Sequence, residues 1–186
     1  MAASLVLLAC FAPLRADVVA LYALGVAVAA AYTDFFKPRG IPEVALSLGH
    51  GLSATSFAYA VAAPLTMTGV AAGILLGMLA GMIVSIDHLQ DVTDFRRRAQ
   101  SLAEMIFKTR VRLSSLWWFA VTSTLVMQAG FVLMGWLPRE TMLSIFVLPP
   151  AHVAGILLDY SFERGVHLGL MTMWLFAALM AVGAAV

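Results

Sequence analysis

Residues 65–94 have the sequence LTMTGVAAGILLGMLAGMIVSIDHLQDVTD, and this stretch decides the class of fold. Its first part, Leu65 to Ile86, contains no charged residue. It is long enough to cross a bilayer as one helix, which takes about 20 apolar residues. Its second part contains Asp87, Asp91 and Asp94. Ionised groups at a membrane boundary are unfavourable unless they have a function, so the stretch predicts a membrane helix with a candidate site at its end.

The rest of the chain repeats this apolar pattern. Of 186 residues, 62% are hydrophobic and 11% are charged, and the mean hydropathy is +0.97. Soluble domains contain about 25% charged residues. We therefore expect an all-α fold, a polytopic transmembrane helical bundle in a single domain over residues 1–186. About seven apolar segments are expected to form its membrane helices: 1–14, 17–33, 42–62, 65–88, 113–135, 141–158 and 166–186.

The placement of Lys and Arg predicts the orientation, because cytoplasmic loops are enriched in both residues. With alternating loops, one side holds Lys37, Arg39, Arg96, Arg97, Arg98, Lys108, Arg110, Arg112 and Arg164, and the other holds Arg15 and Arg139. We expect the first side to be cytoplasmic, with the N-terminus and the 87–112 loop on it. The C-terminus is then on the opposite side, and the membrane is expected to be a bacterial inner membrane. The net charge of +1 predicts no nucleic-acid partner.

The three acids of the quoted stretch are spaced i, i+4 and i+7, which places them on one face of a helix. Such a face suits Mg²⁺, which prefers oxygen ligands and retains bound phosphate or water. Asp87, Asp91 and Asp94 are therefore candidate metal ligands. The alternative is a solvated helix end paired with Arg96, Arg97 and Arg98.

Basic residues on the same side are candidates for binding a pyrophosphate. Arg binds phosphate through a bidentate fork and Lys binds it as a point charge. The candidates are Lys37, Arg39, Arg98 and Lys108. The alternatives are an ordinary cytoplasmic loop for Lys37 and Arg39, and contact with anionic headgroups for Lys108 and its neighbours Arg110 and Arg112.

Other polar and aromatic residues have simpler expected roles. We expect the last cytoplasmic loop either to gate a cavity or to be plainly solvated; it contains Asp159, Glu163, Arg164 and His167. Trp117, Trp118 and Trp136 are expected in the interfacial aromatic belts. His50 and His152 lie inside apolar segments and are expected to be buried hydrogen-bond partners between helices.

Several of these motifs, in this order, resemble those of the UbiA superfamily of intramembrane prenyltransferases, particularly its naphthoate (menaquinone-pathway) branch. Tyr32-Thr33 and Lys37-Pro-Arg39-Gly40-Ile-Pro-Glu43 are similar to the family's Tyr-Thr…Lys-x-Arg-Gly-x-x-Glu loop. The stretch from Gly49 to Ala62 resembles its Gly-rich helix, and Ile86 to Asp91 resembles Asn-Asn-x-Arg-Asp, the start of its second aspartate motif. Ser101-Leu102-Ala103 resembles the Thr-Leu-Ala that follows, and Trp136-Leu137-Pro138 a short external loop.

The resemblance implies a UbiA-like fold that lacks the family's first two helices, with Mg²⁺ held by the acidic cluster. The sequence also departs from the family pattern. The first motif, Asn-Asp-x-x-Asp-x-x-x-Asp, does not occur, and Phe95 stands where the second motif has an acid. Since the family's two motifs hold the metals and pyrophosphate jointly, the cluster is expected to be half of a site.

Two functions follow, and whether the chain is an enzyme stays open between them. The first is a UbiA-like prenyltransferase, completed by a partner chain or a missing N-terminal part, which transfers a prenyl group from a prenyl pyrophosphate to an aromatic acceptor. The second is a non-catalytic structural subunit of a larger respiratory or photosynthetic membrane complex, with a bound quinone, pigment or lipid. Both predict membrane lipid and other membrane subunits as partners. A small transporter is less well supported, because almost no ionisable residue lies in mid-span.

Overall fold

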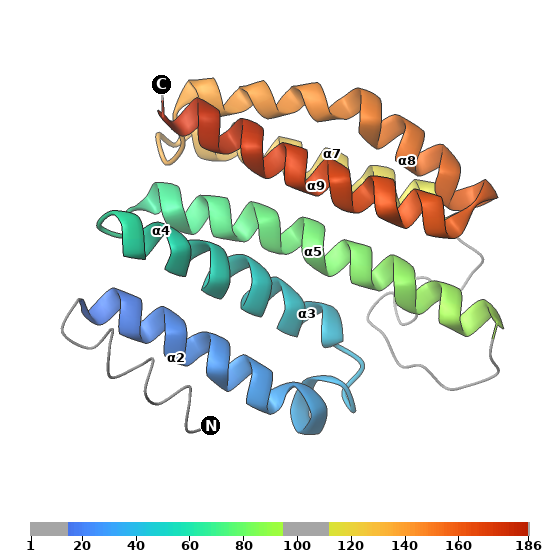
Figure 1. The fold of residues 1–186 in the computed structure, drawn as a ribbon, viewed down its shortest axis with the longest axis horizontal. Coiled ribbons are helices and arrows are strands. Elements are labelled where there is room, and N and C mark those ends of the chain that lie inside the picture. The colour runs from blue at the N-terminus through green and yellow to red at the C-terminus, as the bar shows by residue number, and fades with distance from the viewer. Residues whose placement is uncertain (1–14, 95–111, 186) are drawn as a thin grey trace.

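The computed structural model describes residues 15–94 and 112–185, and it describes side chains from Arg15 to Ile86 and from Arg112 to Ala185. Within these ranges every regular element is helical, and the chain runs back and forth along one axis (Figure 1). In chain order the passes are α2 (Ala16–Ala31) with η1 (Tyr32–Phe36), α3 (Pro42–Leu46) with η2 (Ser47–Thr55) and α4 (Ser56–Ala62), α5 (Met67–Asp94), α7 (Leu113–Leu133), η3 (Arg139–Val147) with α8 (Leu148–Tyr160), and α9 (Phe162–Ala185).

Five of these passes are long and apolar enough to cross a membrane: Ala16–Phe36, Met67–Ile86, Leu113–Leu133, Arg139–Tyr160 and Phe162–Ala185. The α3–η2–α4 pass is built of 5, 9 and 7 residues and is less apolar, because it contains Glu43, His50 and several Ser, Thr and Gly residues. The expected all-helical fold is confirmed for the described residues, and the five candidate spans match an integral membrane protein. Five spans, and not seven, are found among the described residues, and segment 1–14 lies outside them.

Helix α5 is the central helix of the molecule. Of the residues in its span, 56% are buried, the largest share of the five. One face carries Ala71, Leu75 and Leu79, which pack with Phe131 and other large side chains of α7, η3 and α9. Further along, Ile86 packs with Leu116, Trp117, Val121, Ala151, Ala154 and Leu158 of α7 and α8. Both core clusters therefore lie between α5 and the C-terminal helices.

The other face of α5 consists of Gly69, Gly73, Gly77 and Gly81, four residues apart and hence on one helix face. It packs against η2 and α3 with the two backbones in direct contact. A Cβ on Gly51 would lie 2.1 Å from the Cα of Gly77, and a Cβ on Gly77 would lie 2.5 Å from the carbonyl oxygen of Ser47. Small residues allow the two backbones to approach this closely. The resulting van der Waals contact stabilises helix packing in a membrane, where burial of apolar side chains provides no hydrophobic driving force.

A pair of prolines explains the 3₁₀ geometry at the end of η3. Pro149 and Pro150 have no backbone N–H, so the carbonyl of Ile145 cannot accept the usual bond from a residue four positions later. It accepts instead from the N–H of Leu148, three positions later, which is the 3₁₀ pattern. The α-helix continues from Leu148 to Tyr160.

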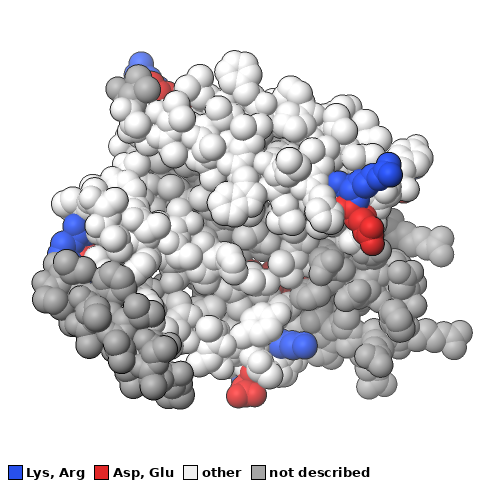
Figure 2. All heavy atoms as spheres, viewed as in Figure 1, with Lys and Arg blue, Asp and Glu red and all other residues white. Residues whose placement is uncertain are grey.

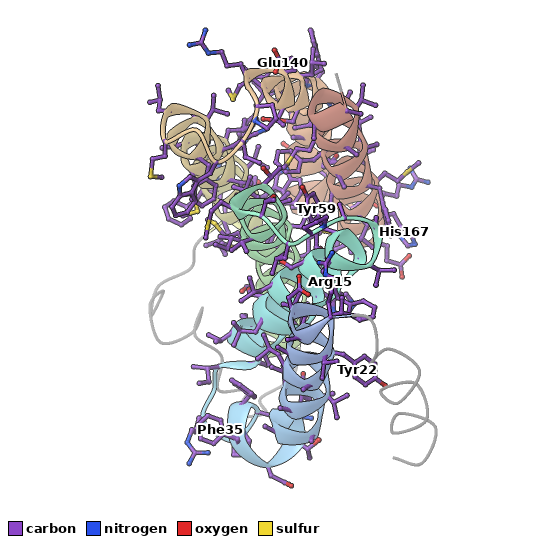
Figure 3. The ribbon with its side chains drawn as sticks, turned by 90° about the vertical axis from the view of Figure 1, so that its left-hand side faces the viewer. Arg15, Tyr22, Phe35, Tyr59, Glu140 and His167 are labelled. Carbon is purple, nitrogen blue, oxygen red and sulfur yellow. The ribbon has the colours of Figure 1, made fainter. Side chains whose placement is uncertain are left out.

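Charged side chains gather at the two ends of the helices and leave an uncharged middle (Figure 2). One end carries Arg15, Asp17, Arg139 and Glu140. Arg15 donates to Asp17 and to the carbonyl oxygen of Ala63, and Asp17 accepts from the N–H of Leu65. This network connects the start of α2 to the turn between α4 and α5. Figure 3 views the molecule from this end, with Arg15 and Glu140 labelled.

Candidate functional site

The opposite side of the bundle, where α5 ends, carries five of the predicted site residues: Asp87, Asp91, Asp94, Lys37 and Arg39. Four chain segments lie on this side: the turn between η1 and α3, the end of α5, the start of α7 and the connection between α8 and α9 (Figure 1). We call this the α5 end. The described Lys and Arg residues at this end are Lys37, Arg39, Arg112 and Arg164.

The acidic stretch continues α5 without a break. The candidate membrane span ends at Ile86, and the helix runs on to Asp94. Asp87, Asp91 and Asp94 therefore have the helical spacing that places them on one face, just beyond the span. Their side chains lie outside the described residues, as do the predicted pyrophosphate ligands Arg98 and Lys108.

The turn that carries Lys37 and Arg39 is set by the local sequence. Gly40 has a φ of +68°, a left-handed conformation that favours glycine, and Pro42 lies in the first turn of α3. The Arg39 guanidinium lies 3.8 Å from the Phe35 ring centroid and donates to the Phe35 carbonyl oxygen at 3.1 Å. Lys37 is exposed. The turn thus presents two cations at the α5 end, one of them positioned on an aromatic ring.

Glu43, the acid of the Lys-x-Arg-Gly-x-x-Glu stretch, is buried between α3 and α5, with 5% of its surface exposed. A Cβ on Gly81 of α5 would lie 3.1 Å from its carbonyl oxygen. Gly81 precedes Asp87 by six residues, or about 9 Å along a helix. Glu43 is therefore buried beside α5 less than two helical turns before Asp87, on a different face of that helix from the three acids, which sequence reasoning did not predict.

The last polar segment has a structural role that the sequence did not reveal. Asp159, at the end of α8, accepts from the hydroxyl of Ser114 at 2.6 Å and from its backbone N–H at 3.3 Å. A carboxylate at a helix N-terminus is favourable because of the exposed N–H groups and the helix dipole. Asp159 therefore fixes the start of α7 against the end of α8. In the same segment, His167 Nδ1 lies 2.7 Å from the Glu163 carbonyl oxygen.

Two expectations about aromatic residues and histidines were wrong. Trp117 is not in an interfacial belt: it is 1% exposed, and its indole N–H donates to the carbonyl oxygen of Ala151 at 2.8 Å. Room for its ring comes from Gly155 and Gly169, where a Cβ would touch it. His50 and His152 are exposed rather than buried. His152 lies beside Trp118, with 5.6 Å between ring centroids.

Two of the cavities among the described residues lie open to the sides of the molecule. One, of about 440 Å³, lies between α2 and the α3–η2 segment and is lined by Tyr32 and His50 among apolar residues. The other, of about 220 Å³, lies between α4, α5, η3 and α9, towards the end opposite the acids, and is lined by Tyr59, Thr68 and Thr141 among apolar residues. Neither is lined by Asp, Glu, Lys or Arg, so neither suits a pyrophosphate.

Among the side chains that the structure describes, no three of His, Cys, Asp and Glu come close enough to hold a metal. The three aspartates of α5 are not among those side chains, so the metal prediction for them stays a prediction. No protein-family model, curated protein or solved structure matches this chain, and the similarity to the UbiA superfamily rests on the motifs alone.

Proposed function

We propose that this protein is a UbiA-like, prenyltransferase-related membrane protein, which binds a prenyl pyrophosphate at the α5 end and transfers the prenyl group to an aromatic acceptor when a partner completes the site. One observation carries the proposal. Helix α5 is unbroken from its span to Asp94, so that Asp87, Asp91 and Asp94 share one face at the end of the bundle that also presents Lys37 and Arg39.

The donor set fits Mg²⁺, because carboxylate oxygens one helical turn apart are hard ligands that leave other positions to phosphate or water. When bound, the metal would neutralise pyrophosphate charge. The chain's own residues would bind and orient the pyrophosphate. Lys37 and Arg39 would bind phosphate oxygens from the neighbouring turn. The Phe35 ring under Arg39 would hold the guanidinium in place.

A second candidate is a non-catalytic subunit of a larger membrane complex. The observation that favours it is the exposure of α2, which lies at one edge of the bundle (Figure 3). Only 11% of the residues in the span Ala16–Phe36 are buried, against 28% to 56% in the other four. A helix of this kind is well suited to an interface with another membrane chain.

An activity assay in membranes tests the first candidate. Membranes that contain the full chain and the products of its neighbouring genes are incubated with geranyl pyrophosphate and a dihydroxynaphthoate acceptor, with and without Mg²⁺. We expect Mg²⁺-dependent transfer. Asp91→Asn should lower the rate of transfer by more than about 100-fold. Loss of a residue that only supports a metal ligand typically lowers activity by about 10- to 100-fold, and loss of a ligand itself should lower it further.

Asp34→Asn is the matched control, since Asp34 is an exposed acid at the α5 end that is not in the cluster. It should leave the rate unchanged. Absence of transfer in every such membrane, or equal loss in both variants, would contradict the proposal. Co-purification with a large complex and no transfer would favour the second candidate.

A further inference from the structure

His50 is a polar residue in the middle of a helical pass that lies between two candidate membrane spans in the chain. It is the fourth of the nine residues of η2, in the middle segment of the α3–η2–α4 pass, and it is exposed. Polar and ionisable residues inside a membrane usually face a bundle interior or a cavity and mark a functional site. Among the described residues its imidazole forms no hydrogen bond, although its backbone carbonyl accepts one from Thr55. An exposed mid-pass imidazole therefore requires a partner.

The surroundings of His50 form a cavity of a size suited to a small molecule. Its volume of about 440 Å³ is within the range of about 300–1,000 Å³ that is typical of ligand sites. The lining includes Gly25 and Ala29 from α2, with Tyr32 at the end of that helix, and Gly49 beside His50. Small residues at the base of the cavity leave room for a flat group, and the imidazole and the Tyr32 phenol are its two polar side chains.

The local backbone gives independent support. Residues Ser47–Thr55 form a π-helix, and π-helical turns occur frequently at functional sites. A second cavity, of about 350 Å³, shares Gly25, Ala29 and Gly49 with the first and continues it towards Phe57. The two cavities together form a groove along the α2–η2 contact, with His50 and Tyr32 at one end and a continuation lined by Tyr22, Ser53 and apolar residues.

We propose that this groove binds an uncharged, lipid-soluble ring compound with carbonyl or hydroxyl oxygens, such as a quinone or quinol, with its tail along the apolar part. A charged headgroup is disfavoured, because no charged residue lines either cavity. An acyl chain has no group that could bond to His50 and Tyr32. The proposal rests on the second candidate function, a subunit that holds a quinone, and it does not require prenyl transfer, because the groove contains none of the residues assigned to pyrophosphate.

Binding of decylubiquinone to the purified full chain in mild detergent tests the proposal. The bound quinone is extracted after gel filtration and quantified over a range of concentrations. We expect saturable binding that decanol, which has the tail but no ring, does not displace. His50→Leu should weaken it about threefold to tenfold, the value of one hydrogen bond.

Two further variants separate loss of the site from loss of the fold. Ala29→Phe places a bulky side chain in the groove at an exposed position and should abolish binding while the thermal unfolding temperature is retained. His152→Leu removes an exposed histidine of another membrane helix, outside the groove, and should leave the affinity unchanged. Non-saturable uptake, displacement by decanol, equal effects of His50→Leu and His152→Leu, or full binding by Ala29→Phe would each overturn the proposal.

Discussion

At the scale of single residues, some of the buried polar groups that the structure describes form hydrogen bonds to a neighbouring helix. Trp117 of α7 donates to Ala151 of α8. Gln128 of α7, which is 0% exposed, donates to the carbonyl oxygen of Thr141 at 2.7 Å and accepts from the hydroxyl of Ser144 at 2.7 Å. Without water to replace a lost partner, each bond specifies which helices pack together.

The Trp117 bond predicts a stability difference between two tryptophans. Trp117→Phe keeps most of the ring but leaves the Ala151 carbonyl without its donor, and we expect a loss of about 1–2 kcal/mol in unfolding free energy. Trp174→Phe is the control, because Trp174 is 71% exposed. Unfolding in detergent, followed by circular dichroism, measures both. Equal stability of the two variants would contradict a structural role for Trp117.

The hydrogen bonds of Gln128 predict a second difference in unfolding free energy between two variants. Gln128→Leu leaves the Ser144 hydroxyl without its acceptor and Thr141 without its side-chain donor, and should destabilise by about 1–3 kcal/mol. Ser123→Leu is suitable as a control on the same helix, since Ser123 is only partly buried. The same unfolding experiment applies. A Gln128→Leu protein as stable as the unchanged one would contradict the importance of the network.

At the scale of elements, the position of α5 depends on its two unlike faces. Large side chains fill the space towards α7 and α9, and glycines allow the backbone of η2 to approach on the other side. The hydroxyl of Ser56 donates to the Gly69 carbonyl oxygen at 3.1 Å across the same contact. Any Cβ added between these backbones must push the elements apart.

The glycine contact predicts a contrast between two glycine-to-alanine changes. Gly51→Ala should destabilise by about 1–3 kcal/mol, because the added Cβ would lie 2.1 Å from the Cα of Gly77 and overpacking has this cost. Gly130→Ala, where nothing lies within 4 Å of the added atom, should stabilise helix α7 by about 0.5–1 kcal/mol. Thermal unfolding in detergent measures both. Destabilisation by Gly130→Ala, or none by Gly51→Ala, would contradict the packing described.

At the scale of the whole molecule, the charges at the two ends and the uncharged middle match a bilayer. The end with the most Lys and Arg is expected to be cytoplasmic. Lys37→Cys and Glu140→Cys, each in a Cys10→Ser background, lie at opposite ends. A membrane-impermeant maleimide should label Glu140→Cys in intact cells and Lys37→Cys only after permeabilisation. The reverse pattern would contradict the orientation.

The sequence predicted the helices well, because apolar runs and prolines act locally. The segments 42–62 and 113–135 match the passes Pro42–Ala62 and Leu113–Leu133 closely. The tertiary role of Trp117 and the exposure of His50 were mispredicted, because both depend on which helix is adjacent. The four-residue spacing of Gly69, Gly73, Gly77 and Gly81 is a sequence pattern that indicates close helix packing, and it could have predicted the α5–η2 contact. The buried position of Glu43 had no such local signal.

The central claim is that the acidic face of α5 binds a pyrophosphate through Mg²⁺, and direct binding tests it most simply. Radiolabelled geranyl pyrophosphate is titrated into the purified full chain, together with its partner subunits where these co-purify, in Mg²⁺ and in EDTA. We predict saturable binding in Mg²⁺ that is lost in EDTA and in an Asp87→Asn, Asp91→Asn double variant, but retained in Asp34→Asn. No binding in Mg²⁺, or binding that the double variant and EDTA leave unchanged, would contradict the claim.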